Sequence, residues 1–167
     1  MSIRSIFVTL RPQQWVKNFV LFAGLVFSQN LSNSDMVLKT IFGFALFCLL
    51  SSSVYILNDI LDIESDKKHP LKSNRPIARG DIKTSTAVIL FVILALVSLV
   101  LSYRLSPSFA LTALGYFVLN LLYSLYLKHV VIIDVMCIAL GFVLRAVAGA
   151  VVIGVEISAW LIVCTTL

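Results

Sequence analysis

Long apolar runs dominate this 167-residue sequence and decide what it can fold into. About 20 mostly apolar residues cross the hydrocarbon core of a bilayer as a helix, and these runs lack the strict alternation of a barrel strand. Only helices and closed barrels satisfy their backbone polar groups in lipid. We therefore expect an all-α polytopic membrane protein with five complete transmembrane helices and a truncated sixth. The complete helices are expected at residues 15–31, 37–57, 85–105, 107–127 and 130–155, and the truncated one at 158–167.

The composition leaves little room for another class of protein. Apolar residues make up 60% of the chain and charged residues 13%, against about 45–50% and 25% in soluble domains. An ordinary soluble domain and a disordered chain are both excluded. The last apolar run is about ten residues long and reaches only about 15 Å as a helix. We therefore expect residues 1–167 to form a single transmembrane helical domain that is the N-terminal fragment of a longer protein.

Basic residues are distributed unevenly between the two ends of the expected helices. If the helices alternate in direction, ten of the 13 lysines and arginines share one side with the N-terminus and the 58–84 connection. Only Lys39 and Arg104 lie on the other side. Because positively charged loops remain in the cytoplasm, we expect an integral protein of the cell (inner) membrane whose N-terminus and 58–84 connection are cytoplasmic. The net charge of +5 is explained as a topology signal, and no nucleic-acid partner is expected.

Five of the eight acidic residues also gather in the 58–84 connection, although a topology signal needs no carboxylates. Asp59, Asp62 and Asp66 are spaced three and four residues apart. A helix that continues out of the second run places these three carboxylates on one face, whereas Glu64 points elsewhere. Stacked carboxylates repel one another, and Mg²⁺ neutralises such a group because it binds carboxylate and phosphate oxygens together. A solvated, charged helix end is the alternative interpretation.

Cations follow these carboxylates along the chain. Pro70 is expected to end the helix, and Lys72, Arg75 and Arg79 then lie on an irregular segment that is able to fold back. Carboxylates for a metal, followed by cations for phosphate oxygens, form the arrangement that a Mg²⁺–diphosphate needs. The connection therefore predicts a diphosphate site at one edge of the membrane.

Arg145 lies deep in the fifth apolar run, with Asp134 three helical turns before it on the same face as Gly141 and Gly149. An arginine inside the membrane is costly and usually faces a polar cavity or a partner. We therefore expect Arg145 to face such a cavity. The alternative is a structural pair within small-residue helix packing.

Four polar residues lie where other runs meet the same side of the membrane. Tyr123 and Lys128 lie at the end of the fourth run, and Lys17 and Asn18 lie one turn into the first run. Interfacial tyrosines and snorkelling lysines are common, so a structural role is the alternative for the first pair. We expect Lys17 and Asn18 to face the same cavity as Arg145.

Together these residues resemble the UbiA superfamily of intramembrane prenyltransferases. The acidic motif N-D-x-x-D-x-x-x-D of that superfamily stands complete from Asn58 to Asp66, and its R-P-I-A-x-G segment stands at 75–80. Further segments resemble the decaprenyl-phosphate phosphoribosyltransferase branch more narrowly. These segments are residues 10–18, 69–72, 127–129 and 144–149.

The resemblance implies a nine-helix transferase, of which this chain would hold slightly over half. It implies phosphoribosyl diphosphate as the donor, a polyprenyl phosphate lipid as the acceptor and Mg²⁺ as the cofactor, and it leaves the oligomeric state open. The residues implied in metal binding and catalysis are Asp59, Asp62, Asp66, Lys72 and Arg75. The residues implied in substrate binding are Lys17, Asn18, Asn58, Tyr123, Lys128 and Arg145.

Two alternative functions remain at this point. A prenyltransferase with a prenyl diphosphate donor and an aromatic or other small acceptor would use the same carboxylates. A cation-binding membrane transporter is an alternative from another class. Transporters usually place their ion ligands near the bilayer midplane, whereas these acids fall at the edge of the second run.

Overall fold

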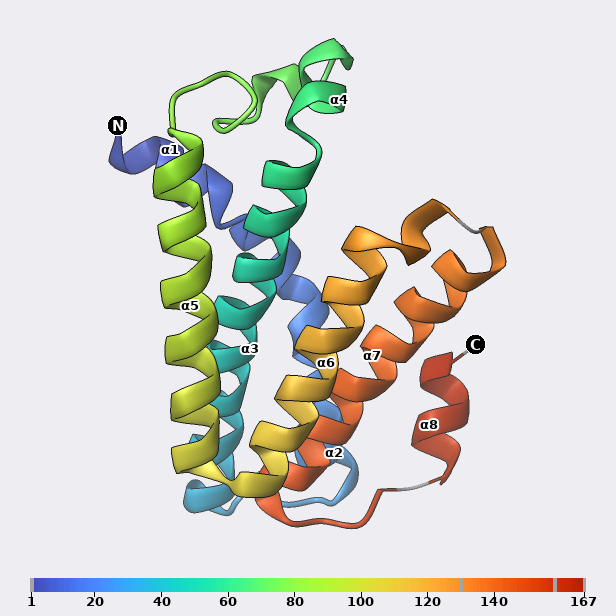
Figure 1. Cartoon of the computed structure of the whole chain (residues 1–167). Coiled ribbons are helices and arrows are strands. Elements are labelled where there is room, and N and C mark those ends of the chain that lie inside the picture. The colour runs from blue at the N-terminus through green and yellow to red at the C-terminus, as the bar shows by residue number, and fades with distance from the viewer. Residues whose placement is uncertain (1, 130, 158, 167) are drawn as a thin grey trace.

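The computed structural model describes residues 2–129, 131–157 and 159–166, and all regular secondary structure in these ranges is helical. Helices α3, α5, α6 and α7 lie side by side as a bundle (Figure 1). Of the short elements, α1 and α4 lie at one end of the bundle, and α2 lies towards the other end (Figure 1). The elements are α1 (Ile3–Thr9), η1 (Pro12–Leu21), α2 (Phe22–Phe27), α3 (Ser34–Leu61), α4 (Ile63–Lys68), η2 (Lys72–Asn74), α5 (Thr84–Leu105), α6 (Pro107–Leu125), η3 (Leu127–His129), α7 (Val131–Ile153) and α8 (Ala159–Thr166), where η denotes a 3-10 helix.

Four of the helices in the described part of the chain are long and apolar enough to cross a membrane. They are Ser34–Leu61, Thr84–Leu105, Pro107–Leu125 and Ile132–Ile153. These helices coincide with the second to fifth apolar runs, which confirms an all-helical bundle of membrane type. Helix α5 is mostly exposed on the surface of the bundle, as a helix in contact with lipid is expected to be.

The first and sixth apolar runs take other forms. The first run folds as the 3-10 helix η1, which passes directly into the short α-helix α2, instead of one α-helix over 15–31. The sixth run contains α8, which has eight residues. The expected starts of the fifth and sixth runs, residues 130 and 158, and residue 167 lie outside the described residues. The total of five complete helices and a truncated sixth therefore remains a prediction.

Local sequence explains where two of the long helices begin. Asn33 precedes α3, and its side chain accepts hydrogen bonds from the backbone N–H groups of Asp35 and Met36. Ser106 caps α6 in the same manner, and Pro107 occupies the first turn, where its missing N–H costs nothing. Each helix thus starts at a residue that satisfies otherwise unpaired backbone donors.

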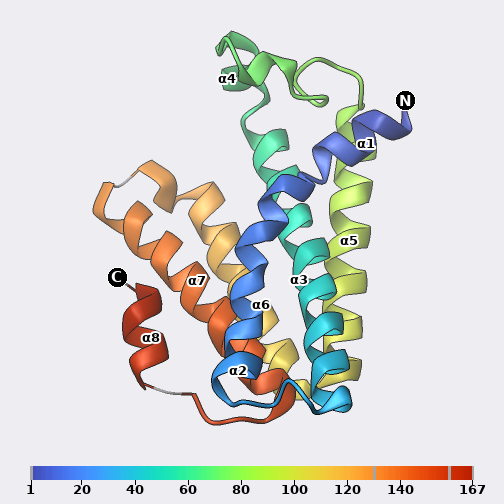
Figure 2. The same ribbon diagram turned by 180° about the vertical axis from the view of Figure 1, so that it is seen from behind.

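Seen from behind, the η1–α2 segment runs across the bundle between α3 and α7 (Figure 2). Gly149 of α7 meets the backbone of Leu21, and Gly24 of α2 meets the backbone of Ala150, so closely that a side chain at either glycine would overlap the neighbouring backbone. Leu21 and Phe47 are fully buried beside this contact. The close approach fixes the η1–α2 segment against the bundle and therefore fixes the side chains that the segment carries.

Candidate active site

The three carboxylates of the acidic motif lie where the regular helix of α3 ends. Asp62 leaves the helical conformation, with φ −98° and ψ 10°, and α4 begins at the next residue. We expected one continuous helix through all three positions. Because the chain turns at Asp62, the carboxylates of Asp59 and Asp66 share a contact with Arg75, whereas the carboxylate of Asp62 contacts Lys128.

Arg75 bridges two of the carboxylates. Its Nη1 donates to Oδ1 of Asp59 at 3.1 Å and to Oδ2 of Asp66 at 2.6 Å. Both aspartates are almost completely buried, with 2% and 1% of their surface exposed. Arg11 also donates to Oδ1 of Asp59, and its guanidinium lies over the ring of Tyr55. The buried charges of this cluster are therefore compensated within the protein.

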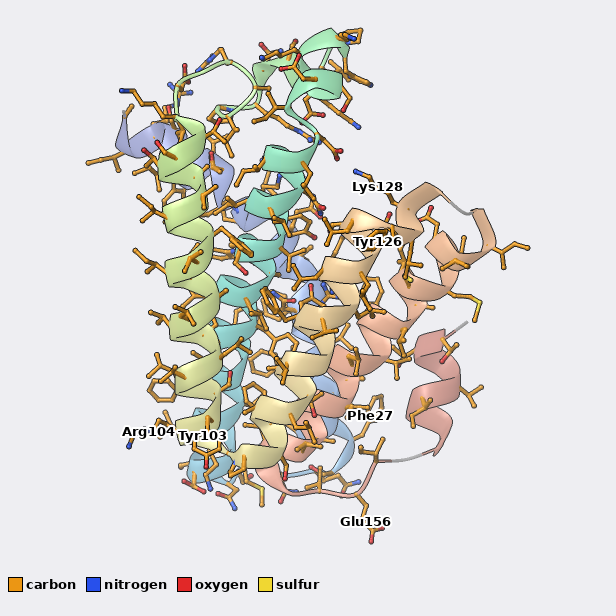
Figure 3. All side chains as sticks on the ribbon, in the orientation of Figure 1. Phe27, Tyr103, Arg104, Tyr126, Lys128 and Glu156 are labelled. Atoms are coloured by element: carbon orange, nitrogen blue, oxygen red, sulfur yellow. The ribbon has the colours of Figure 1, made fainter. Side chains whose placement is uncertain are left out.

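Asp62 pairs with a cation from another part of the bundle. Its Oδ1 accepts a hydrogen bond from Nζ of Lys128 at 2.5 Å. Lys128 lies on η3, and Figure 3 shows its side chain pointing from the α6–α7 connection towards the end of α3. This ion pair joins the two sides of the bundle at the end where the acidic motif lies.

Glu64 points away from this cluster, as expected. Its side chain is exposed and accepts a hydrogen bond from Lys67 at 2.8 Å. That hydrogen bond holds the pKa of Glu64 below its usual range. The carboxylate therefore belongs to a solvated helix surface and not to the buried cluster.

The three aspartates fit Mg²⁺ by the chemistry of their oxygens, although the described residues contain no preformed trio of metal ligands. Because one Arg75 nitrogen contacts both, Oδ1 of Asp59 and Oδ2 of Asp66 are at most 5.7 Å apart. Mg²⁺ bonds at about 2.1 Å would need these oxygens about 4 Å apart or closer. In the described part of the chain, nothing donates to Oδ2 of Asp59. If Arg75 were released and the carboxylates of Asp59 and Asp66 moved closer together, a Mg²⁺ ion would thus fit between them.

A cavity of about 230 Å³ lies inside the bundle below this cluster. We call it the central cavity. Four of the residues singled out from the sequence line it, which are Lys17, Asn58, Tyr123 and Arg145. None of the described residues that line it is acidic. The remaining lining residues are Val54, Tyr55, Tyr116, Asn120, Cys137, Ile138, Gly141 and Phe142.

Arg145 forms one wall of the central cavity and is bound by neutral groups. Its Nε donates to Oδ1 of Asn18 at 2.8 Å, its Nη1 to the carbonyl oxygen of Gly141 at 3.0 Å and its Nη2 to the hydroxyl of Tyr116 at 2.8 Å. The guanidinium also lies over the Tyr116 and Phe142 rings. Arg145 thus lies in the wall of a polar cavity. Asn18, which we expected to face the same cavity, is instead fully buried against Arg145 and is not among the described residues that line the cavity.

The other polar residue of α7 has a separate partner. Asp134 accepts a hydrogen bond from the hydroxyl of Tyr123 at 2.7 Å. Although Asp134 and Arg145 lie three turns apart on one helix, the structure does not pair them. The charge of Arg145 is therefore not neutralised from its own helix.

A second cavity, of about 420 Å³, lies on the other side of α3. We call it the outer cavity. Arg11, Asp59 and Arg75 line it, together with Gln13, Gln14 and Asn74. Asn58 faces the central cavity and Asp59 the outer one, so two adjacent residues of α3 open to different spaces.

Lys72 is the one site residue from the sequence that the structure leaves apart. It is exposed on η2, and its backbone N–H donates to Nδ1 of His69. Its side chain makes no hydrogen bond or ion pair within the described residues. The catalytic role expected for Lys72 therefore requires a bound substrate that its side chain can contact.

Two residues of the site escaped the sequence reasoning. Arg11 was counted among the topology signals, yet its left-handed backbone, with φ 52°, directs it to Asp59. A residue before proline avoids the right-handed helical region, and Arg11 also lies in the 10–18 segment that carries the resemblance. Tyr116 reads as a core aromatic, and it does pack on Phe47 with 5.3 Å between ring centroids. A buried tyrosine hydroxyl needs a partner, and Arg145 was the available donor.

Known proteins are similar in sequence to this chain over most of its length. The decaprenyl-phosphate phosphoribosyltransferases of Mycolicibacterium smegmatis and Corynebacterium glutamicum are each 36% identical to it over 155 residues, which is 90% of this chain but 49% and 47% of those proteins. A digeranylgeranylglyceryl phosphate synthase of Sulfurisphaera tokodaii is 33% identical over 107 residues, 64% of this chain and 37% of that protein. The chain thus spans about half the length of the curated relatives that it matches.

Solved structures show the same arrangement of helices. A UbiA homolog from Archaeoglobus fulgidus bound to DMAPP and Mg²⁺ superposes with a TM-score of 0.79 at 24% identity, over 94% of this chain and 57% of that one. The model of the UbiA prenyltransferase family matches residues 18–167. This match and the four apolar helices identify an integral membrane protein with the fold of a transferase family. The chain belongs to the UbiA prenyltransferase family.

Proposed function

We propose that this chain is the site-bearing part of a Mg²⁺-dependent intramembrane transferase. It moves a 5-phosphoribosyl group from phosphoribosyl diphosphate to a polyprenyl phosphate at the cytoplasmic face of the membrane. The observation that supports this most is the 36% identity, over 155 residues, to two decaprenyl-phosphate phosphoribosyltransferases. The carboxylate cluster beside a cation-lined cavity is the arrangement that such a reaction needs.

The reaction breaks the bond between C1 of the ribose and the diphosphate oxygen. A phosphate oxygen of the lipid forms the new bond to C1, and the diphosphate leaves with the electron pair of the broken bond. Asp59, Asp62 and Asp66 would hold Mg²⁺, which stabilises negative charge on the leaving diphosphate. Arg75 exchanges its carboxylate partners for the diphosphate oxygens, and Lys72 adds a second cation there. Stabilising charge that develops on the leaving group lowers the barrier.

The central cavity would receive the remaining phosphate groups. Lys17 and Arg145 line it as cations without an acidic neighbour in the lining, and Lys128 lies at the end of the bundle where Asp62 ends α3. These three cations position phosphates of the donor or the acceptor. Asn58 and Tyr123 contribute polar groups to the same wall.

The proposal includes the placement of the chain in the membrane. The η1–α2 segment and the four long helices would make five crossings, and α8 would begin a sixth. The N-terminus and the acidic motif would then share the cytoplasmic side, as the ten basic residues of that side predict. Figure 3 shows Lys128 at this end of the bundle and Arg104 and Glu156 at the opposite end. The complete enzyme would have nine helices, of which this single domain is the N-terminal part.

Prenyl transfer to an aromatic or other small acceptor is the second candidate function. It is favoured by the similarity to a digeranylgeranylglyceryl phosphate synthase over 107 residues. Both reactions place a diphosphate at the same carboxylates. Competition separates them, because phosphoribosyl diphosphate is expected to inhibit only an enzyme that binds the ribose.

Transfer of labelled phosphoribose to polyprenyl phosphate in detergent tests the proposal. A full-length protein that includes this chain should be active with Mg²⁺ and inactive with a chelator. The double variant Asp59→Ala/Asp62→Ala should lose at least about 100-fold in rate, by analogy with the loss of one oxyanion-hole donor. Full activity in this variant would overturn the metal assignment, and transfer of a prenyl group instead would support the second candidate function.

A further inference from the structure

We infer that Asn18 is a positioning residue that holds Arg145 without neutralising it, so that the guanidinium stays available to a phosphate group in the central cavity. Asn18, Tyr116 and the carbonyl group of Gly141 together form what we call the neutral cradle of Arg145. This inference rests on the proposed function, because it assigns the ligand of Arg145 as a phosphate or diphosphate of the substrates.

The neutral cradle satisfies the hydrogen-bond donors of the guanidinium but does not neutralise its charge. All three of its nitrogens donate to uncharged oxygens, and only 6% of Arg145 is exposed. No carboxylate in the described ranges, 2–129, 131–157 and 159–166, pairs with Arg145. A buried cation without a counter-ion is costly inside a membrane protein. An anionic ligand that enters the cavity supplies the missing charge.

Asn18 is the member of the cradle at which a counter-ion would fit most easily. Its Nδ2 lies 3.2 Å from the hydroxyl oxygen of Ser51 and 3.3 Å from the sulfur of Cys48. A hydroxyl and a thiol can each donate as well as accept. The thiol of Cys48 could therefore donate to a carboxylate oxygen, and so could the hydroxyl of Ser51 after turning from the Cys48 carbonyl oxygen, to which it now donates at 3.1 Å. An aspartate of the same shape would thus pair with Arg145 at little steric cost. The amide in its place leaves the positive charge uncompensated.

The position of Asn18 is fixed from outside the cavity. Leu21 lies one turn further along the 3-10 helix η1 and rests against Gly149, which lies one turn after Arg145 on α7. Lys17, the neighbour of Asn18, lines the central cavity as a second cation. The η1 segment therefore delivers one cation and one neutral orienting group to the same phosphate position.

Thermal unfolding of the purified chain in detergent, titrated with inorganic diphosphate in the presence of a chelator, tests the inference. Removing divalent metal leaves the cations as the diphosphate-binding groups. The midpoint of the unmodified chain should rise with diphosphate. Asn18→Asp should unfold no lower without ligand but should need about 10- to 100-fold more diphosphate for the same rise, the loss expected for one hydrogen bond to a charged group. An Asn18→Asp chain that responds like the unmodified one overturns the inference.

Asn30→Asp is the matched control, because it adds the same charge at the connection between α2 and α3, where the Asn30 amide bonds only to Ser28 within the described residues. It should respond like the unmodified chain, and an equal loss would overturn the inference by showing a general effect of charge.

If Asn18→Asp does not fold, Asn18→Thr and Asn18→Val replace it, since the two side chains share a shape and only threonine offers an oxygen. The Asn18→Thr chain should bind diphosphate about tenfold more tightly than the Asn18→Val chain. Equal binding by the two chains would mean that Asn18 contributes only packing and does not orient Arg145.

The same titration keeps the inference separate from the proposed function. Diphosphate binding that depends on Asn18, in a protein that transfers no phosphoribose, refutes the proposed function alone. Phosphoribosyl transfer by a protein in which Asn18→Asp binds diphosphate normally refutes the inference alone.

Discussion

Replacement of Gly149 by alanine should move the η1 segment and break the contact between Asn18 and Arg145. A Cβ atom at this position would lie 1.9 Å from the carbonyl oxygen of Leu21, whereas real Cβ contacts stay above about 3.0 Å. The segment must therefore move away from α7 by at least about 1.1 Å, the difference between these two distances.

That displacement exceeds what the hydrogen bond can absorb. Asn18 and Leu21 lie one 3-10 turn apart, and Arg145 and Gly149 lie one α-helical turn apart, so the two pairs face each other. A movement of 1.1 Å would lengthen the distance from Arg145 Nε to Asn18 Oδ1 from 2.8 Å to about 3.9 Å. Overpacking costs about 1–3 kcal/mol, and a lost hydrogen bond to a charged group costs about 1.5–3 kcal/mol. We expect a total loss of about 2.5–6 kcal/mol in the free energy of unfolding.

Denaturant unfolding of the purified chain in detergent, followed by circular dichroism, measures this loss. Gly115→Ala is the matched control, because a Cβ at Gly115 meets no atom within 4 Å. Alanine is favoured over glycine inside a helix by about 1 kcal/mol, so this control should be unchanged or slightly more stable. A Gly149→Ala chain as stable as the Gly115→Ala chain would refute the close packing of Leu21 on α7.

Two further predictions concern carboxylates outside the long helices. Asp62→Asn should weaken Mg²⁺ binding by at least about 10- to 100-fold, the loss typical for a residue that only supports a metal ligand. Glu64→Gln should leave Mg²⁺ binding unchanged, because Glu64 is exposed and bound to Lys67. Calorimetric titration with Mg²⁺ distinguishes the two variants, and equal losses would show that only the overall charge matters. The hydrogen bond from Arg79 holds the pKa of Asp81 below its usual range. This pair should therefore stabilise the fold fully at pH values above the ordinary aspartate pKa of about 3.9. The stabilisation should disappear as the pH falls through the lower pKa of Asp81 in the folded protein. Arg79→Ala should raise that pKa in an NMR titration, and an unchanged value would assign the shift to another group.

The sequence predicted the long helices well because each is an apolar run bounded by a cap or by charged residues. Helices α5 and α6 lie within two residues of the expected limits. The run at 15–31 was predicted less well. Its 3-10 segment packs through Leu21 against Gly149, a residue more than 120 positions away, and no local pattern contains that contact.

The site was partly visible in the sequence for a related physical reason. An intramembrane charge is costly, so Arg145 stood out as a residue that needs a partner. The acidic motif stood out because three carboxylates on one helix face repel one another. Their partners did not stand out, because Arg11 lies among other basic residues and Tyr116 lies among apolar ones. The bend at Asp62 was also hidden, since three- and four-residue spacing reads as a continuous helix.

The 3-10 form of η1 also sets how far this part of the chain reaches. A 3-10 helix rises about 2.0 Å per residue and an α-helix about 1.5 Å, so the ten residues of η1 and the six of α2 together extend about 29 Å. This is close to the thickness of the hydrocarbon core, although the segment has fewer residues than an ordinary transmembrane helix. If η1 rewound as an α-helix, it would shorten by about 5 Å. Arg11 could then not stay on Asp59 while Gly24 stayed on α7. Measured in ångströms and not in residues, the η1–α2 segment is about as long as the hydrocarbon core is thick, and the contacts at its two ends fix that length.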